Sequence, residues 1–276
     1  MKLVFCIFLT YSIFLLATPL KIVTPIAPNY DLIKPVLGDM GTIQIIIPAN
    51  VEVHNFEPTP RDILAINKAD ILFYTDDKLE PWIAKFKSEF IKTLTIKELT
   101  SFIKNYNGNP HIWLDPIYAK EVVIGITNTL IEINPQNKEV YSKNSEIFQK
   151  KLQNLHEAYR TTLKKYKNRK IIFIGHNAFS FLENRYGLDI VSPFSNSSEN
   201  SEPTPKAIKS IIDFGKKNNI KYIFYEKNQN SKFADVIAKE LDAKLIPLDT
   251  LETARGDYID LMNENLKNLE QGLKNE

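Results

Sequence analysis

Hydrophobic positions follow two different patterns along the chain. Short apolar runs rich in β-branched residues, which are typical of buried strands, precede longer stretches whose apolar residues recur every three or four positions, as in helices. The pattern occurs once in each half of the chain, so each half is predicted to hold a mostly parallel sheet flanked by helices. The expected strands are residues 21–24, 42–48, 69–74, 170–175, 189–192, 222–226 and 244–248.

Proline and capping residues mark several helix starts. Thr59 before Pro60 and Asp115 before Pro116 place a polar N-cap directly before a proline in the first turn. The run at 42–48 (TIQIIIP) is continuous enough to predict a strand buried on both faces. The expected helices are residues 30–37, 60–68, 116–133, 136–167, 178–185, 205–218, 232–241 and 258–273.

The stretch 136–167 is the longest of these predicted helices. It contains no Gly or Pro, and its apolar residues recur at helical spacing from Val140 to Tyr166. At about 1.5 Å per residue it would exceed about 40 Å, which is longer than one small lobe is wide. The pattern therefore predicts two α/β lobes joined by one long backbone helix.

The N-terminus has the pattern of an export signal. One lysine precedes the apolar run at 3–16, which is short for a membrane span of about 20 residues but fits the apolar region of a secretory signal. No clear cleavage site follows, so a cleaved signal and an uncleaved anchor both stay open. The predicted organisation is 1–19 signal or anchor, 20–134 N-terminal lobe, 135–167 linking helix and 168–276 C-terminal lobe.

Composition narrows the partners and the chemistry. Hydrophobic residues make up 43%, charged residues 25%, and the formal net charge is +2, so the chain has no basic bias that would indicate a nucleic-acid partner. The single cysteine, Cys6, lies in the N-terminal apolar run. A metal site elsewhere must therefore use histidine and carboxylate ligands.

Three of the four histidines occupy similar places in the predicted topology. His54 and His111 come shortly before predicted helices, and His176 directly follows the strand 170–175; Asp249 follows the strand 244–248. Ligands in open α/β sheets bind outside the carboxyl ends of the strands. These four side chains, two from each lobe, could converge in the cleft between the lobes. His156, on the long helix, is interpreted as structural.

The residues around these histidines resemble a known family. The segments are HNFEPTP (54–60), NPHIWLDP (109–116), and HNAFSFL (176–182) followed by RYGL (185–188). Together they resemble the metal-binding receptors (solute-binding proteins) of bacterial zinc and manganese ABC importers, from about residue 21 to the C-terminus. The resemblance implies two α/β lobes joined by a long helix, with the metal in the interlobe cleft. It also implies metal ligands at His54, His111, His176 and Asp249.

The family further implies a transport role. The expected protein is a monomeric receptor, periplasmic or otherwise extracytoplasmic and either free or tethered to the inner membrane. It would deliver metal to the permease of an ABC importer. The loop at 101–109 lacks the histidines that many zinc receptors carry there. The fourth ligand also stays open, because Glu252 and Asp257 lie close to Asp249 in the sequence.

Ligand type favours zinc as the cargo. Imidazole suits Zn²⁺, whereas Mn²⁺ prefers carboxylate-rich sites with more ligands. Three histidines and one carboxylate would form a tetrahedral Zn²⁺ site, and Glu226 is expected nearby to offset the remaining positive charge. A manganese receptor or a receptor for both metals is the alternative within the family.

Two other function classes are alternatives to transport. A zinc hydrolase would use the three histidines as ligands and Asp249 as general base. A closed set of four ligands leaves no position for substrate, so the sequence predicts no enzyme. A cell-adhesion protein that only retains the family fold is less favoured, because the ligand set is intact.

Overall fold

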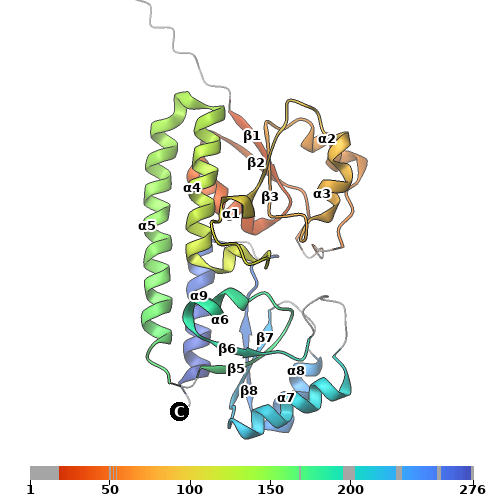
Figure 1. Ribbon diagram of the computed structural model, residues 1–276, viewed down its shortest axis with the longest axis vertical. Helices are drawn as coiled ribbons and strands as arrows, with labels where there is room; N and C mark the ends of the chain where they lie inside the picture. Colours follow the sequence, from red (N-terminus) through yellow and green to blue (C-terminus); the bar gives the residue numbers. More distant parts are fainter. Residues whose placement is uncertain are drawn as a thin grey trace, which may run out of the picture.

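The protein consists of two α/β lobes arranged along one long helix (Figure 1). The computed structural model describes residues 19–49, 51, 53, 55–167, 169–194, 203–227, 232–253 and 256–274. Each lobe holds a four-stranded parallel sheet, in the order β2-β1-β3-β4 in the first lobe and β6-β5-β7-β8 in the second. This architecture confirms the predicted fold class. The predicted signal segment lies, apart from Pro19, outside the described residues.

The strands agree in part with the predicted runs. They are β1 (Leu20–Thr24), β2 (Gly41–Ile45), β3 (Ile71–Tyr74), β4 (Thr95–Glu98), β5 (Lys170–Ile174), β6 (Asp189–Val191), β7 (Tyr222–Glu226) and β8 (Lys244–Leu248). The prediction that 42–48 is buried on both faces is wrong, because β2 forms an edge of its sheet and every β2 residue is half-buried or exposed. The short strand β4 (TIKE) was not predicted, since it is half polar.

The described helices agree in part with the predicted ones. They are α1 (Ala27–Leu37), α2 (Pro60–Ile66), α3 (Pro81–Phe86), α4 (Pro116–Ile133), α5 (Lys138–Leu163), α6 (Ser180–Tyr186), α7 (Pro205–Lys217), α8 (Lys232–Leu241) and α9 (Tyr258–Leu273). The Thr59 side chain accepts from Asp62 N at the start of α2, and Asp115 accepts from Ile117 N at the start of α4. Among the described helices, none is both long and apolar enough to cross a membrane.

Helix α5 packs along both lobes. Its 26 residues give a length of about 39 Å, and it begins at Lys138 because residues Pro135–Asn137 form a separate 3₁₀ turn. Figure 1 shows α4 beside α5 and α9 next to the lower part of α5, and α5 contacts α1, α4, α6 and α9. One continuous cluster of buried apolar side chains runs from Phe73 in the first sheet through Tyr159 of α5 to Phe224 in the second sheet. The two lobes thus share a core.

A buried polar network lies at the carboxyl end of β3. Glu80 is fully buried and accepts from the main-chain N–H groups of Thr75 and Asp76. Asp76 in turn accepts from the Tyr106 hydroxyl, which anchors the segment that leads to His111. Burial raises the pKa of Glu80 to about 8, although the hydrogen bonds from these main-chain groups oppose the shift.

We expect Glu80 to make the stability of the protein depend on pH. Its pKa is raised above the unfolded value, so the folded state binds more protons, and stability falls as pH rises from about 4.5 to about 8. Each pKa unit corresponds to about 1.4 kcal/mol, so this loss is on the order of 3–5 kcal/mol. Glu80→Gln keeps a side-chain acceptor without the charge, and should reduce the decline by most of this amount. Urea unfolding between pH 5 and pH 8 measures it.

Glu146→Gln is the matched control, because Glu146 is exposed on α5. This variant should follow the pH dependence of the wild type. A Glu80→Gln variant that declines as steeply as the wild type would show that Glu80 is not the group responsible.

Candidate metal centre

Three side chains from both lobes converge between the two sheets. His111 Nε2 lies 3.0 Å from His176 Nε2, and Glu252 Oε1 lies 2.9 Å from His111 Nε2 and 3.2 Å from His176 Nε2. The three side chains are 5–9% exposed. Of the described residues, these form the group of three or more His, Cys or acidic side chains that could hold one metal ion.

His111 is placed by a short turn before α4. It directly precedes the 3₁₀ helix η3 (Ile112–Leu114), and its main-chain N–H and its Nδ1 both face Asn109 Oδ1, at 3.0 and 2.7 Å. A main-chain N–H is always a donor, so the Asn109 atom that faces it is the carbonyl oxygen. The Nδ1 of His111 therefore carries a proton, and in the neutral ring the Nε2 lone pair faces the site.

His176 follows β5 and is oriented by β7. Its Nδ1 donates to Glu226 Oε2 at 2.9 Å, and its main-chain N–H points to the same oxygen at 3.3 Å. This contact fits the expected place of Glu226 beside the ligands. Glycine is required at 175, because a Cβ there would lie 2.6 Å from the Phe173 ring and 2.8 Å from Glu226 Oε2. The missing side chain lets Glu226 approach His176.

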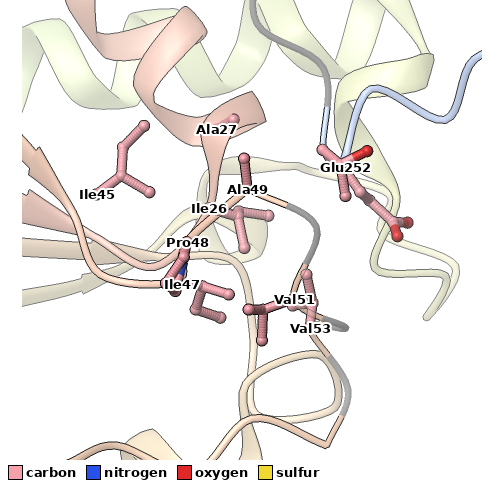
Figure 2. A pocket seen from close by; sticks show the side chains of 10 residues that line it. Ile26, Ala27, Ile45, Ile47, Pro48, Ala49, Val51, Val53 and Glu252 are labelled. Atoms are coloured by element: carbon pink, nitrogen blue, oxygen red, sulfur yellow. The ribbon is translucent and has the colours of Figure 1, made fainter. Parts of the chain in front are cut away.

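Glu252 is presented by a strained turn after β8. Leu251 has φ 65°, a left-handed conformation that costs a non-glycine residue about 1–2 kcal/mol. Two contacts hold the turn: the Leu251 side chain is fully buried, and its N–H donates to Asp249 Oδ1 at 2.8 Å. Glu252 also lines a small cavity of about 10 Å³, whose apolar wall includes Ile26, Ala49, Val51 and Val53 (Figure 2).

The contacts within the site raise the pKa of His176 and lower the pKa of Glu252. Burial alone would lower the pKa of His176, but hydrogen bonds and charge from the Glu226 and Glu252 carboxylates raise it to about 11. Burial alone would raise the pKa of Glu252, yet the His111 and His176 imidazoles lower it well below its usual range. The neighbouring groups therefore favour a protonated His176 imidazole beside an ionised Glu252 carboxylate.

The three donors fit one divalent metal ion. In a tetrahedral zinc site with bonds of about 2.0–2.1 Å, neighbouring ligand atoms lie about 3.3 Å apart. The observed separations of 2.9, 3.0 and 3.2 Å are close to that value. Glu252 Oε1 is also buried, and both imidazole Nε2 atoms lie close to it. The two imidazole nitrogens and the carboxylate oxygen lie around one position, as the ligands of a single metal ion do.

The predicted ligands divide into three groups. His111 and His176 meet as expected, whereas His54 lies outside the described residues. Asp249 is not part of the described cluster: its Oδ2 lies 3.2 Å from Lys227 Nζ, and its main chain pairs with Asn265. The described site is thus two histidines and Glu252, not three histidines and Asp249. Glu252, which the sequence left open as the fourth ligand, lies in the described cluster because the Leu251 turn directs it inward.

Three further residues are not members of the cluster of His111, His176 and Glu252. Asp257 is exposed and caps α9 by accepting from Ile259 N, away from the cluster. His156 contacts the Tyr186 hydroxyl at 2.9 Å, in agreement with its structural interpretation. Sequence reasoning missed Asn109, and its place in the segment NPH, two residues before a predicted ligand, was the available signal.

Hydrogen bonds and an ion pair connect the two lobes beside this site. Arg185 of α6 makes a two-oxygen contact with the buried Asp115 carboxylate, at 2.7 and 2.6 Å from Nε. The Trp113 indole donates to Thr250 O, and the Tyr258 hydroxyl donates to Trp113 O. Burial raises the pKa of Asp115, and the Arg185 charge opposes that shift.

Comparison with known proteins gives consistent similarities. A family model described as zinc-uptake complex component A, periplasmic (ZnuA) matches residues 22–272. The high-affinity zinc uptake system protein ZnuA of Bacillus subtilis is 33% identical over 281 residues, covering 92% of this chain and 88% of that protein. The zinc-binding lipoprotein AdcA of Streptococcus pneumoniae is 31% identical over 91% of this chain, which spans 55% of AdcA.

Solved structures show the same fold. The Zn(II)-bound ZnuA-like domain of Streptococcus pneumoniae AdcA has a TM-score of 0.81 and 31% identity, covering 93% of this chain and 99% of that one. The laminin binding protein Lmb of Streptococcus agalactiae, described as bifunctional with adhesin and metal transporting activity, has a TM-score of 0.84 and 32% identity. That match covers 93% of this chain and 100% of Lmb.

We expect Arg185→Met to destabilise the protein by about 2–3 kcal/mol, because it leaves the Asp115 carboxylate buried without its partner. Loss of the guanidinium raises the pKa of Asp115 further, so the destabilisation should be larger at pH 8 than at pH 5. Urea unfolding at both pH values measures the effect.

Arg160→Met is the control, because Arg160 is about half exposed and pairs with Glu157 at the surface. Its effect should stay within about 0.5 kcal/mol. Equal effects of the two substitutions would contradict a stabilising role for the pair between the lobes.

Proposed function

Because this chain belongs to the ZnuA family of zinc-uptake solute-binding proteins, we propose that it captures Zn²⁺ outside the cytoplasm and delivers it to the permease of an ABC importer. The family consists of transport receptors and not enzymes, so the hydrolase alternative is set aside. The observation that carries the proposal is the convergence of His111, His176 and Glu252 on one point between the lobes.

The proposed ligand set is His111, His176, Glu252 and His54. His54 enters on the sequence resemblance alone, and the other three on their mutual distances. Asp249 is the competing carboxylate, but its contacts with Lys227 and with the turn at Leu251 support a structural role. In this set Asp249 shapes the turn that presents Glu252.

Donor type supports zinc over manganese. Three imidazoles and one carboxylate match the nitrogen and oxygen ligands of tetrahedral Zn²⁺, whereas Mn²⁺ prefers more oxygen donors. One carboxylate leaves a net charge of about +1 on the bound ion. Glu226, hydrogen-bonded to His176, places a second carboxylate beside it and offsets that charge.

The site also supports transport by a single copy of the chain. All proposed ligands come from one chain, so the receptor is expected to work as a monomer whose partner is the importer permease. Four protein ligands leave no open position for a reacting water or substrate, as capture and release of an ion require. The family description, periplasmic, supports an exported protein that works next to the membrane.

Calorimetric titration of metal-stripped protein with Zn²⁺ and with Mn²⁺ tests the function. We expect one tight zinc site and weaker manganese binding. His176→Ala should weaken zinc binding by more than about 100-fold, because removing a direct ligand costs more than removing a residue that only supports one.

His156→Ala is the control for this titration. His156 lies on α5 and contacts Tyr186, so its loss should leave zinc affinity unchanged. Equal affinity for both metals would indicate a receptor for both, and no zinc site in the wild type would overturn the proposal.

A second pair of variants distinguishes the carboxylates. Glu252→Gln should weaken zinc binding by more than about 100-fold, since it removes the anionic donor. Asp249→Asn should keep affinity within about 10-fold of the wild type while lowering stability, because it weakens the turn at Leu251. The same calorimetric titration, combined with urea unfolding, measures both. The reverse pattern would identify Asp249 as the ligand.

A further inference from the structure

The residue that links the two halves of the metal centre is an asparagine that is not among the proposed ligands. Asn109 lies in the first lobe, in the segment between β4 and η3. Its side-chain oxygen accepts from His111 N and from His111 Nδ1, at 3.0 and 2.7 Å. Its side-chain nitrogen donates to Asn177 O at 2.9 Å and to Ser180 Oγ, both in the second lobe.

Each end of the amide acts on a different half of the site. The oxygen fixes the proton of His111 on Nδ1, which leaves Nε2 as the donor to the metal. The nitrogen donates to the main chain of Asn177, the residue that follows His176 in the second lobe. An amide side chain can accept at one end and donate at the other in this way.

The segment around Asn109 is itself anchored to the first lobe. Lys78 Nζ donates to Gly108 O at 3.1 Å, and the Tyr106 hydroxyl donates to Asp76 at the end of β3. These contacts fix the main chain on either side of Asn107, whose side chain accepts from Asn109 N. Asn109 is therefore held firmly enough to transmit position from one lobe to the other.

We propose that Asn109 couples the two lobes to zinc binding, by setting the tautomer of His111 and by holding the His176 segment through its amide NH₂ group. This inference rests on the proposed function. When the lobes separate, the hydrogen bonds from Asn109 to Asn177 and Ser180 break. Asn109 then still orients His111, but it no longer holds the second lobe. Zinc release is thereby tied to the breaking of these hydrogen bonds.

Three variants separate the two ends of the amide. Asn109→Ala removes both, and should weaken zinc binding by about 10–100-fold, the usual cost of losing a residue that supports a ligand. Asn109→Asp keeps the acceptor for His111 but replaces the donor to the second lobe with an oxygen. Ser180→Ala removes one partner in the second lobe and leaves His111 untouched.

The measurements are zinc affinity by chelator competition, zinc release by stopped flow, and the His111 ring protons by long-range ¹H–¹⁵N NMR of the zinc-loaded protein. Ser180→Ala should keep the His111 Nδ1–H signal and release zinc faster than the wild type, and Asn109→Asp should keep that signal. Asn109→Ala should lose that signal as well. A purely structural role would not separate the NMR signal from the release rate.

Asn154→Ala, at an exposed asparagine of α5, is the matched control and should change neither quantity. If the wild type binds zinc and Asn109→Ala shows the same affinity and release rate, the coupling by Asn109 is overturned while the proposed function stands. Absence of zinc binding in the wild type would overturn the proposed function and this inference together. Circular dichroism checks that each variant is folded, and Ser180→Ala provides the comparison if Asn109→Ala does not fold.

Discussion

The metal centre exists because one buried stripe on α5 packs against both lobes at once. The stripe holds Tyr141, Phe148, Leu152, Leu155, Tyr159 and Leu163, and it belongs to a core that reaches the sheets of both lobes. A long helix packed in this way cannot bend without exposing apolar surface to water. The loops that carry His111 and His176 therefore face each other across a short and defined distance.

Within that frame, hydrogen bonds decide what the site can bind. Asn109 and Glu226 each hold the Nδ1 side of one imidazole, so both Nε2 atoms face inward. Glu252 adds a carboxylate oxygen from the strained turn at Leu251. Without a cation or protons, three electron-rich atoms this close would repel one another, and this repulsion is what a divalent metal relieves.

The sequence was most reliable where local chemistry decides the structure. The residues 222–226, 232–241, 244–248 and 258–273 were predicted with the observed bounds, and Thr59 and Asp115 cap helices as expected. The sequence was less reliable where contacts with neighbouring strands determine the structure. An apolar run cannot reveal that β2 lies at a sheet edge, and the half-polar β4 is a strand only because it pairs with β3.

The sequence by itself determined the two-lobe α/β architecture, the long helix, and the prediction that His111 and His176 lie together in one candidate site. Those follow from periodicity, from capping and from motifs that are local in the chain. Only the tertiary structure decided which carboxylate faces the histidines. Asp249 and Glu252 are three residues apart, and a single left-handed residue, Leu251, turns one toward Lys227 and the other into the site. Such a turn depends on the buried packing of Leu251, which local sequence does not encode.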